Sequence, residues 1–174
     1  MRQQSDMILW RVDGGTRPRG KAMTYNADLT GTGRVKHIGY LARGHSYTKG
    51  TTSETFFDHL VALVERPLGA WAGYHTCNLG WCGLRLHPRQ PTFRYKGRVI
   101  GLGDTDIFVP GDEVVYGAPS LILHYIRRHR YAPPSCFVNA VLNCPDSRSQ
   151  EYCAAIKRIA PEMASFLGPT TAPG

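Results

Sequence analysis

The spacing of apolar residues predicts an amphipathic helix within residues 51–67 (TTSETFFDHLVALVERP). Its apolar stripe, at helical intervals, consists of Phe56, Leu60, Leu63 and Val64. Thr51 and Glu54 are spaced as a capping box, in which each side chain hydrogen-bonds to the backbone N–H of the other residue. Pro67 ends the pattern, because proline cannot continue a helix.

Shorter apolar runs around this helix predict strands. VKHIGYL, residues 35–41, has the alternation and β-branched content of a short strand. Between residues 69 and 109, apolar residues set among glycines and prolines predict short antiparallel strands. FRYKGRVIGL predicts a hairpin that turns at Lys96–Gly97, and DIFVPGDEVVYGAP predicts two strands joined at residues 110–112.

The C-terminal third has a helical pattern. SLILHYIRRHRY predicts a helix that begins at Pro119 or Ser120 and stops before Pro133–Pro134. PSCFVNAVL predicts a second helix, and a third runs from about residue 149 to 167 with a break near Pro161. We therefore expect an α+β fold, with a small antiparallel sheet and a helical C-terminal third.

Length and composition fit one folded domain. The chain has 174 residues, of which 42% are hydrophobic and 20% charged. Residues 1–23 combine glycine, proline and basic side chains around one short apolar patch, so we expect a flexible basic arm there. We expect one domain over residues 24–167 and a disordered tail over residues 168–174.

The chain is basic, which favours anionic partners. Its net charge is +8, and nucleic acid and phosphorylated or acidic ligands are the candidate partners. The basic residues are spread over small groups, which a solvated surface explains as well. The groups are Arg17, Arg19 and Lys21; Arg94, Lys96 and Arg98; and Arg127, Arg128 and Arg130.

The location is expected to be cytoplasmic. The apolar run near the N-terminus, residues 7–10, is too short for a signal-peptide core or a membrane span. Five cysteines are an odd number in a chain without an export signal. Thiols or metal ligands are therefore favoured over a disulfide framework.

Two cysteines and two histidines have the pair spacings of a zinc site. GYHTCNLGWCG places Cys77 and Cys82 as C-x4-C, and the helix that follows places His124 and His129 as H-x4-H. The interval between the pairs is far longer than in a compact zinc finger, but a hairpin-rich insert can return the chain to its start. We predict these four residues as metal ligands for a structural Zn²⁺ ion.

The histidine spacing imposes a condition on the helix. Five positions of an ideal helix turn about 500°, which leaves the two side chains about 140° apart. Both can face one ion only if the last helical turn loosens, as the following prolines would favour. Without a metal, the cysteines would be small buried hydrophobes and the histidines a core and a surface residue.

Two other interpretations of the cysteine stretch stay open. His75 lies two positions before Cys77, so on a strand both side chains would share a face and His75 could replace Cys82 as a ligand. Three protein ligands would leave a position open for water. A redox dithiol is disfavoured by the spacing and by the strand-like surroundings. Cys136 and Cys144 are marginal alternative ligands, and Cys153 is expected to pack.

Candidate acid–base residues are fewer. Asp104 and Asp106 are two positions apart in a stretch with several glycines. They could be paired carboxylates in a pocket, or they could cap a glycine-rich turn. Aromatic residues with polar tips suit an organic-ligand pocket or stacked bases, although core packing explains most of them. They are Tyr40, Tyr47, Trp71, Tyr74, Trp81, Tyr95 and Tyr116.

Three stretches resemble a family of small actinobacterial proteins without a known activity. They are YNADLT…VKHIGYLARGHSYTKG, GYHTCNLGWCG, and DIFVPG…VVYGAPSLILHYIRRHRYAPPSCFVNAVL, within residues 24–142. The resemblance implies a His-x-Cys element, a second cysteine, and a helix that carries two histidines. On this chain these would be His75, Cys77, Cys82, His124 and His129.

Two classes of function follow from the sequence. The first is a zinc-stabilised binding or regulatory module that engages an anionic partner such as nucleic acid through its basic surface. The second is a small biosynthetic enzyme with an aromatic pocket for a small molecule, in which Asp104, Asp106 or His75 transfers protons.

Overall fold

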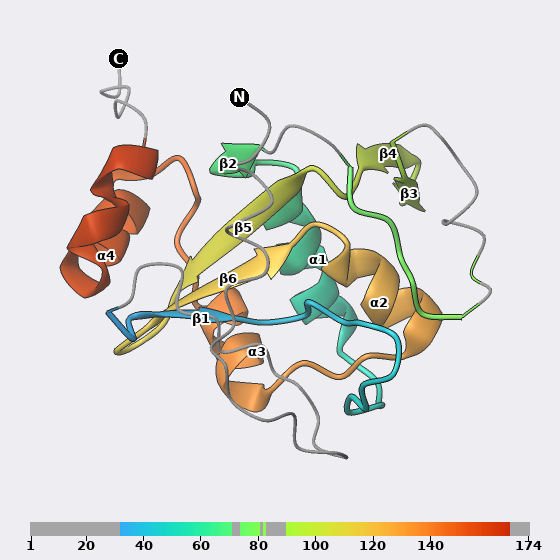
Figure 1. The fold of residues 1–174 in the computed structure, drawn as a ribbon. Helices are drawn as coiled ribbons and strands as arrows, with labels where there is room; N and C mark the ends of the chain where they lie inside the picture. Colours follow the sequence, from blue (N-terminus) through green and yellow to red (C-terminus); the bar gives the residue numbers. More distant parts are fainter. Residues whose placement is uncertain (1–31, 71–73, 81, 83–89, 168–174) are drawn as a thin grey trace, which may run out of the picture.

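The computed structural model describes residues 32–70, 74–80, 82 and 90–167, and the expected arm and tail lie outside these residues. The α+β class is confirmed (Figure 1). The strands are β1 (Val35–His37), β2 (Gly69–Ala70), β3 (Thr92–Tyr95), β4 (Arg98–Gly101), β5 (Thr105–Pro110) and β6 (Val115–Pro119). The helices are α1 (Glu54–Val64), α2 (Ile122–His129), α3 (Ser135–Leu142), α4 (Gln150–Ile159) and the 3-10 helix η1 (Pro161–Phe166).

The main sheet is mixed rather than purely antiparallel. Its strand order is β1-β6-β5-β2, and β5 pairs antiparallel with both β6 and β2. β1 runs parallel to β6, with Val35 opposite Val115. The expectation of an antiparallel sheet was wrong at this strand, because parallel partners need a long crossover and only local hairpins leave a signal in the sequence. β3 and β4 form a separate hairpin.

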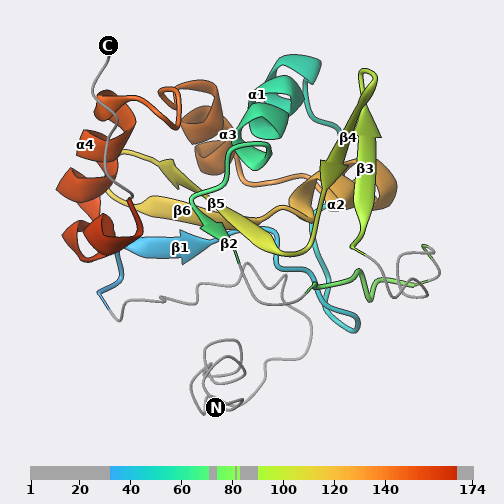
Figure 2. The ribbon, with the colours of Figure 1, turned by 90° about the horizontal axis from the view of Figure 1, so that it is seen from above.

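Helices pack on both faces of the main sheet. Alternate residues of a strand point to opposite faces. On β5, Ile107 and Val109 belong to the core cluster that contains Phe56 of α1, whereas Phe108 belongs to the cluster that contains Tyr152 of α4. Figure 2 shows α1 and α3 together on one side of the strands. The Tyr152 hydroxyl also donates a hydrogen bond to the Phe108 carbonyl, at 2.5 Å, which attaches α4 to β5.

Helix α1 begins at Glu54 because Ser53 caps it. The Ser53 Oγ accepts a hydrogen bond from the Phe56 N–H at 3.2 Å. The predicted capping box on Thr51 was therefore wrong by two residues. Phe56, Leu60, Leu63 and Val64 are all buried, as the apolar stripe predicted.

The β3–β4 hairpin turns at Lys96 and Gly97, which confirms the prediction. Both residues have positive φ, 46° and 78°, as a two-residue turn of this twist requires. Lys96 then reaches Asp58 of α1 at 2.7 Å, and Arg98 reaches Glu65 at 2.6 Å. The hairpin is thus attached to α1 by two ion pairs as well as by the packing of its aromatic rings on Phe57.

The C-terminal helices occur where they were expected, but α2 starts later. Pro119 is still the last residue of β6, and Ser120 accepts a hydrogen bond from the Gly103 N–H at 2.8 Å instead of capping the helix. The helical break at Pro161 is confirmed, since α4 ends at Ile159 and η1 begins at Pro161. Among the described residues, no helix has both the length and the apolar character needed to cross a membrane.

We predict that replacing Ser53 by alanine lowers the free energy of unfolding by about 1 kcal/mol, because the Phe56 N–H loses its acceptor. The matched control, Thr51→Ala, should change it by less than about 0.5 kcal/mol, because Thr51 is exposed and lies before the cap. Urea unfolding followed by circular dichroism measures both. A larger loss for Thr51→Ala would restore the capping box.

Candidate metal centre

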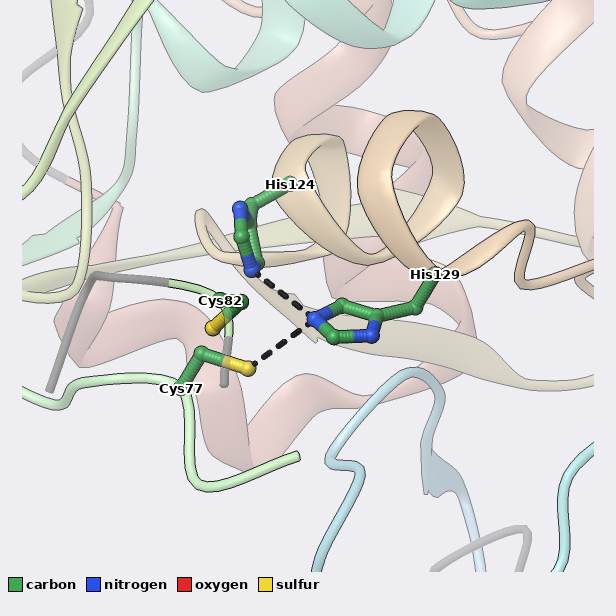
Figure 3. Close-up of side chains that lie close together, drawn as sticks. All are labelled: Cys77, Cys82, His124 and His129. Carbon is green, nitrogen blue, oxygen red and sulfur yellow. Dashed lines mark hydrogen bonds between the residues drawn. The ribbon is translucent and has the colours of Figure 1, made fainter. Parts of the chain in front are cut away.

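Two cysteines and two histidines converge on one point of the structure. Cys77 and Cys82 come from the segment before β3, and His124 and His129 come from α2 (Figure 3). Their ligand atoms all lie within 4.8 Å of one another. Cys77 and His124 are buried, and Cys82 and His129 are partly exposed. The group can therefore hold a metal ion near the surface.

The end of α2 explains how both histidines face the same side. The N–H groups of Arg130 and Tyr131 both donate to the Tyr125 carbonyl, the second at 3.0 Å. A bond that spans five residues instead of four widens the last turn. Arg130 then leaves the helix in a left-handed conformation, with φ 56° and ψ 32°. The loosened last turn that the His spacing required is present.

The segment that contains Cys77 is irregular, and hydrogen bonds to two other parts of the chain hold it in place. Residues 74–80 belong to no helix or strand. The His75 N–H donates to the Gly103 carbonyl at 2.8 Å, and the Arg43 N–H donates to the Asn78 Oδ1 at 3.1 Å. The Leu79 N–H points at the Cys77 Sγ, at 3.4 Å. This last contact favours the thiolate form that binds metals.

The contacts among the four side chains have the size of a tetrahedral coordination shell. The Nε2 atoms of His124 and His129 are 3.1 Å apart, and the Cys77 Sγ is 3.2 Å from the His129 Nε2. Zinc bonds of about 2.0 to 2.3 Å place neighbouring ligand atoms about 3.3 to 3.8 Å apart. Slight outward movement would therefore admit an ion.

Burial favours the neutral forms of Cys77, His124 and His129 when no metal is present. It raises the pKa of the Cys77 thiol to about 12, with the nearby Cys82 adding to the rise and the Leu79 N–H opposing it. Burial also lowers the pKa of His124 to about 4, and the charges of His129 and Arg128 act in the same direction. The pKa of His129 is lowered by burial and then by Arg128 and Lys49. Neutral imidazoles are ready to bind a metal, whereas the thiols must release protons on binding.

The other candidate ligands lie outside this cluster. His75 does not share a face with Cys77, because the segment is not a strand, and its side chain is exposed. Cys136 is exposed on α3, Cys144 follows α3, and Cys153 lies on α4. Of the described residues, the group that could hold a metal ion thus contains only the two cysteines and two histidines chosen by their spacing.

The acid–base candidates do not join the centre. Asp106 is buried on β5 and hydrogen-bonds to Tyr40, whose pKa is raised well above its ordinary value, first by burial and then by the Asp106 charge. Asp104 lies in the turn after Gly103. The sequence named Tyr47 only as a candidate pocket aromatic. Its hydroxyl donates to the His129 carbonyl at 3.4 Å, a contact between distant residues that leaves no signal in the sequence.

We predict that Gly103→Ala displaces the cysteine segment. A Cβ at Gly103 would lie 2.3 Å from the His75 carbonyl oxygen, and its φ of +91° is strained for alanine. The free energy of unfolding should fall by about 2 kcal/mol or more, and metal affinity should fall with it. Gly97→Ala is the control, because its φ is also positive, +78°, but nothing lies within 4 Å. Equal metal affinity in both variants, by competition with a chromogenic chelator, would contradict this role.

Comparison with known families places the chain in a family without an assigned function. A family model described as a domain of unknown function (DUF7919) matches residues 18–142. This range contains all four clustered residues and the three stretches that carried the resemblance. No curated protein and no solved structure matches the chain. Since the match covers most of its length, the chain belongs to the DUF7919 family.

Proposed function

We propose that the protein binds one zinc ion through Cys77, Cys82, His124 and His129 and acts as a zinc-stabilised binding module for an anionic partner. The observation that carries the metal is the convergence of four ligand atoms within 4.8 Å. Two thiolates and two imidazoles are a donor set that selects zinc over magnesium or calcium, which prefer oxygen.

The zinc is proposed to be structural. Four protein ligands fill a tetrahedral shell and leave no position for a reactive water. The ion would join the irregular segment of Cys77 to helix α2, two parts of the chain that no strand pairing connects in the described residues. Metal binding would then contribute directly to the stability of the fold.

An anionic partner is proposed from the charge of the surface. The net charge is +8, but part of the positive charge is neutralised within the fold. Lys96 and Arg98 pair with acidic residues of α1, and Arg127 pairs with Glu54 at 2.8 Å. Four basic residues near the metal centre take part in none of the ion pairs seen among the described residues: Arg43, Lys49, Arg128 and Arg130. Their charge is not neutralised by an ion pair in this part of the chain, which supports a binding surface beside the metal.

We predict that the purified protein contains one equivalent of zinc, and that Cys77→Ser and His124→Ala each lose most of it, because each removes a ligand. Two controls should keep it. His75→Ala removes the competing histidine, which is exposed, and Cys153→Ser removes a cysteine of α4. Elemental analysis by mass spectrometry measures zinc per chain. Full zinc in Cys77→Ser and His124→Ala would refute the site, and loss in His75→Ala would point to an open site.

We predict that removing zinc with a chelator destabilises the fold, because the ion binds the folded chain and not the unfolded one. Free zinc at 100 times the dissociation constant corresponds to about 2.7 kcal/mol of stability. The thermal midpoint should therefore fall on chelation and recover when zinc is returned. An unchanged midpoint in a protein that has lost its zinc would contradict a structural role.

A further inference from the structure

Four exposed basic residues lie on the segments next to the metal centre, and we call them the basic rim: Arg43, Lys49, Arg128 and Arg130. The Arg43 N–H donates to the Oδ1 of Asn78, the residue that follows Cys77, at 3.1 Å. Lys49 lies beside the end of α2, because the Gly50 N–H donates to the Arg130 carbonyl at 2.9 Å and Lys49 bridges to Tyr131. The loop 43–50 and the end of α2 thus lie side by side.

The charges that act on the two histidines are positive. Arg128 acts electrostatically on His124, and Arg128 and Lys49 act on His129. In the described part of the chain, no carboxylate is among the charged groups that act on either histidine. A zinc ion bound by two thiolates and two neutral imidazoles has no net charge, so it would leave the positive potential of the rim in place.

Adjacent arginines of α2 have different surroundings. Arg127 is paired with Glu54 and stacks over the Phe57 ring, with its guanidinium carbon 4.0 Å from the ring centroid. Arg128 makes no ion pair with the described residues and is exposed. Arg127 therefore attaches α2 to α1, whereas the charge of Arg128 is available to a ligand.

Arg130 has a backbone conformation that suits glycine. Its φ of 56° and ψ of 32° lie in the left-handed region, where helices usually end on glycine or asparagine. An arginine at this position gives up some stability without gaining an ion pair among the described residues. Such an outlier beside a binding site points to a functional side chain.

We propose that the basic rim binds the phosphate backbone of a single-stranded nucleic acid, an inference that rests on the proposed zinc-stabilised module. Three of its four residues are arginines, whose planar guanidinium groups bind phosphate through two parallel hydrogen bonds. Tyr74, three residues before Cys77, is 52% exposed, one of the two large hydrophobic side chains in the described part of the chain that are so exposed. Exposed aromatic rings are elements on which the bases of single strands stack.

The test measures binding of a fluorescent oligothymidylate by anisotropy over a series of potassium chloride concentrations. We expect affinity to fall steeply with salt, and the Arg128→Gln/Arg130→Gln variant to bind at least about tenfold more weakly with a salt slope smaller by about 1.4. The matched control is Lys157→Gln/Arg158→Gln, which removes the same charge from α4, at the opposite end of the fold from α2 (Figure 1). This control should bind like the wild type.

Two further measurements separate the explanations. Arg130→Gly should weaken binding without lowering the thermal midpoint, because glycine relieves the left-handed backbone. Zinc content is measured on every sample. If zinc-loaded protein does not bind the oligonucleotide, or if the two double variants bind it equally well, nucleic-acid binding by the basic rim is refuted. The proposed zinc site is not affected by either result. Equal competition by poly-glutamate overturns the choice of nucleic acid, and a wild type without zinc overturns the proposed module itself.

Discussion

The position of the Cys77 segment relative to helix α2 is the constraint on which the candidate site depends. The segment has no strand pairing of its own. It is held by the His75 N–H bond to Gly103, by the Arg43 N–H bond to Asn78 and by the burial of Cys77 in the core. Gly103 is in turn held by Ser120, at the junction of β6 and α2. The sheet and the helix therefore bring the cysteines to the histidines, and a metal ion would fix what these few hydrogen bonds arrange.

The local part of this arrangement could be predicted from the sequence. The two ligands of each pair, Cys77 with Cys82 and His124 with His129, are close in sequence. Their spacings match those of known zinc sites, so each pair could be recognised without the fold. The condition that the last turn of α2 must loosen also followed from helix geometry alone. The structure satisfies it through Arg130 and the shared Tyr125 carbonyl rather than through the prolines alone.

The parts that could not be predicted depend on contacts between distant residues. Nothing near Val35 indicates that it pairs in parallel with Val115. The choice of Ser53 over Thr51 as the cap depends on where α1 meets the core, and both residues have suitable side chains. His75 was a plausible ligand only if its segment were a strand, and the bond to Gly103 gives that segment another course.

The sequence also does not show which basic residues are neutralised by ion pairs in the fold. The sequence counts Arg127 and Arg128 as equal members of one basic group, but the structure pairs the first with Glu54 and leaves the second exposed. Net charge alone indicates that a protein attracts anions and does not show where. The three-dimensional arrangement shows which basic residues are neutralised by ion pairs, and the basic rim takes part in none of those seen in the described part of the chain.

X-ray absorption at the zinc edge tests the central claim most directly, because it reports the ligands of the bound ion. We expect two sulfur ligands at about 2.3 Å and two nitrogen ligands at about 2.0 to 2.1 Å, with no oxygen ligand. A shell with one sulfur, or with a water oxygen in the fourth position, would contradict a closed site made by Cys77, Cys82, His124 and His129.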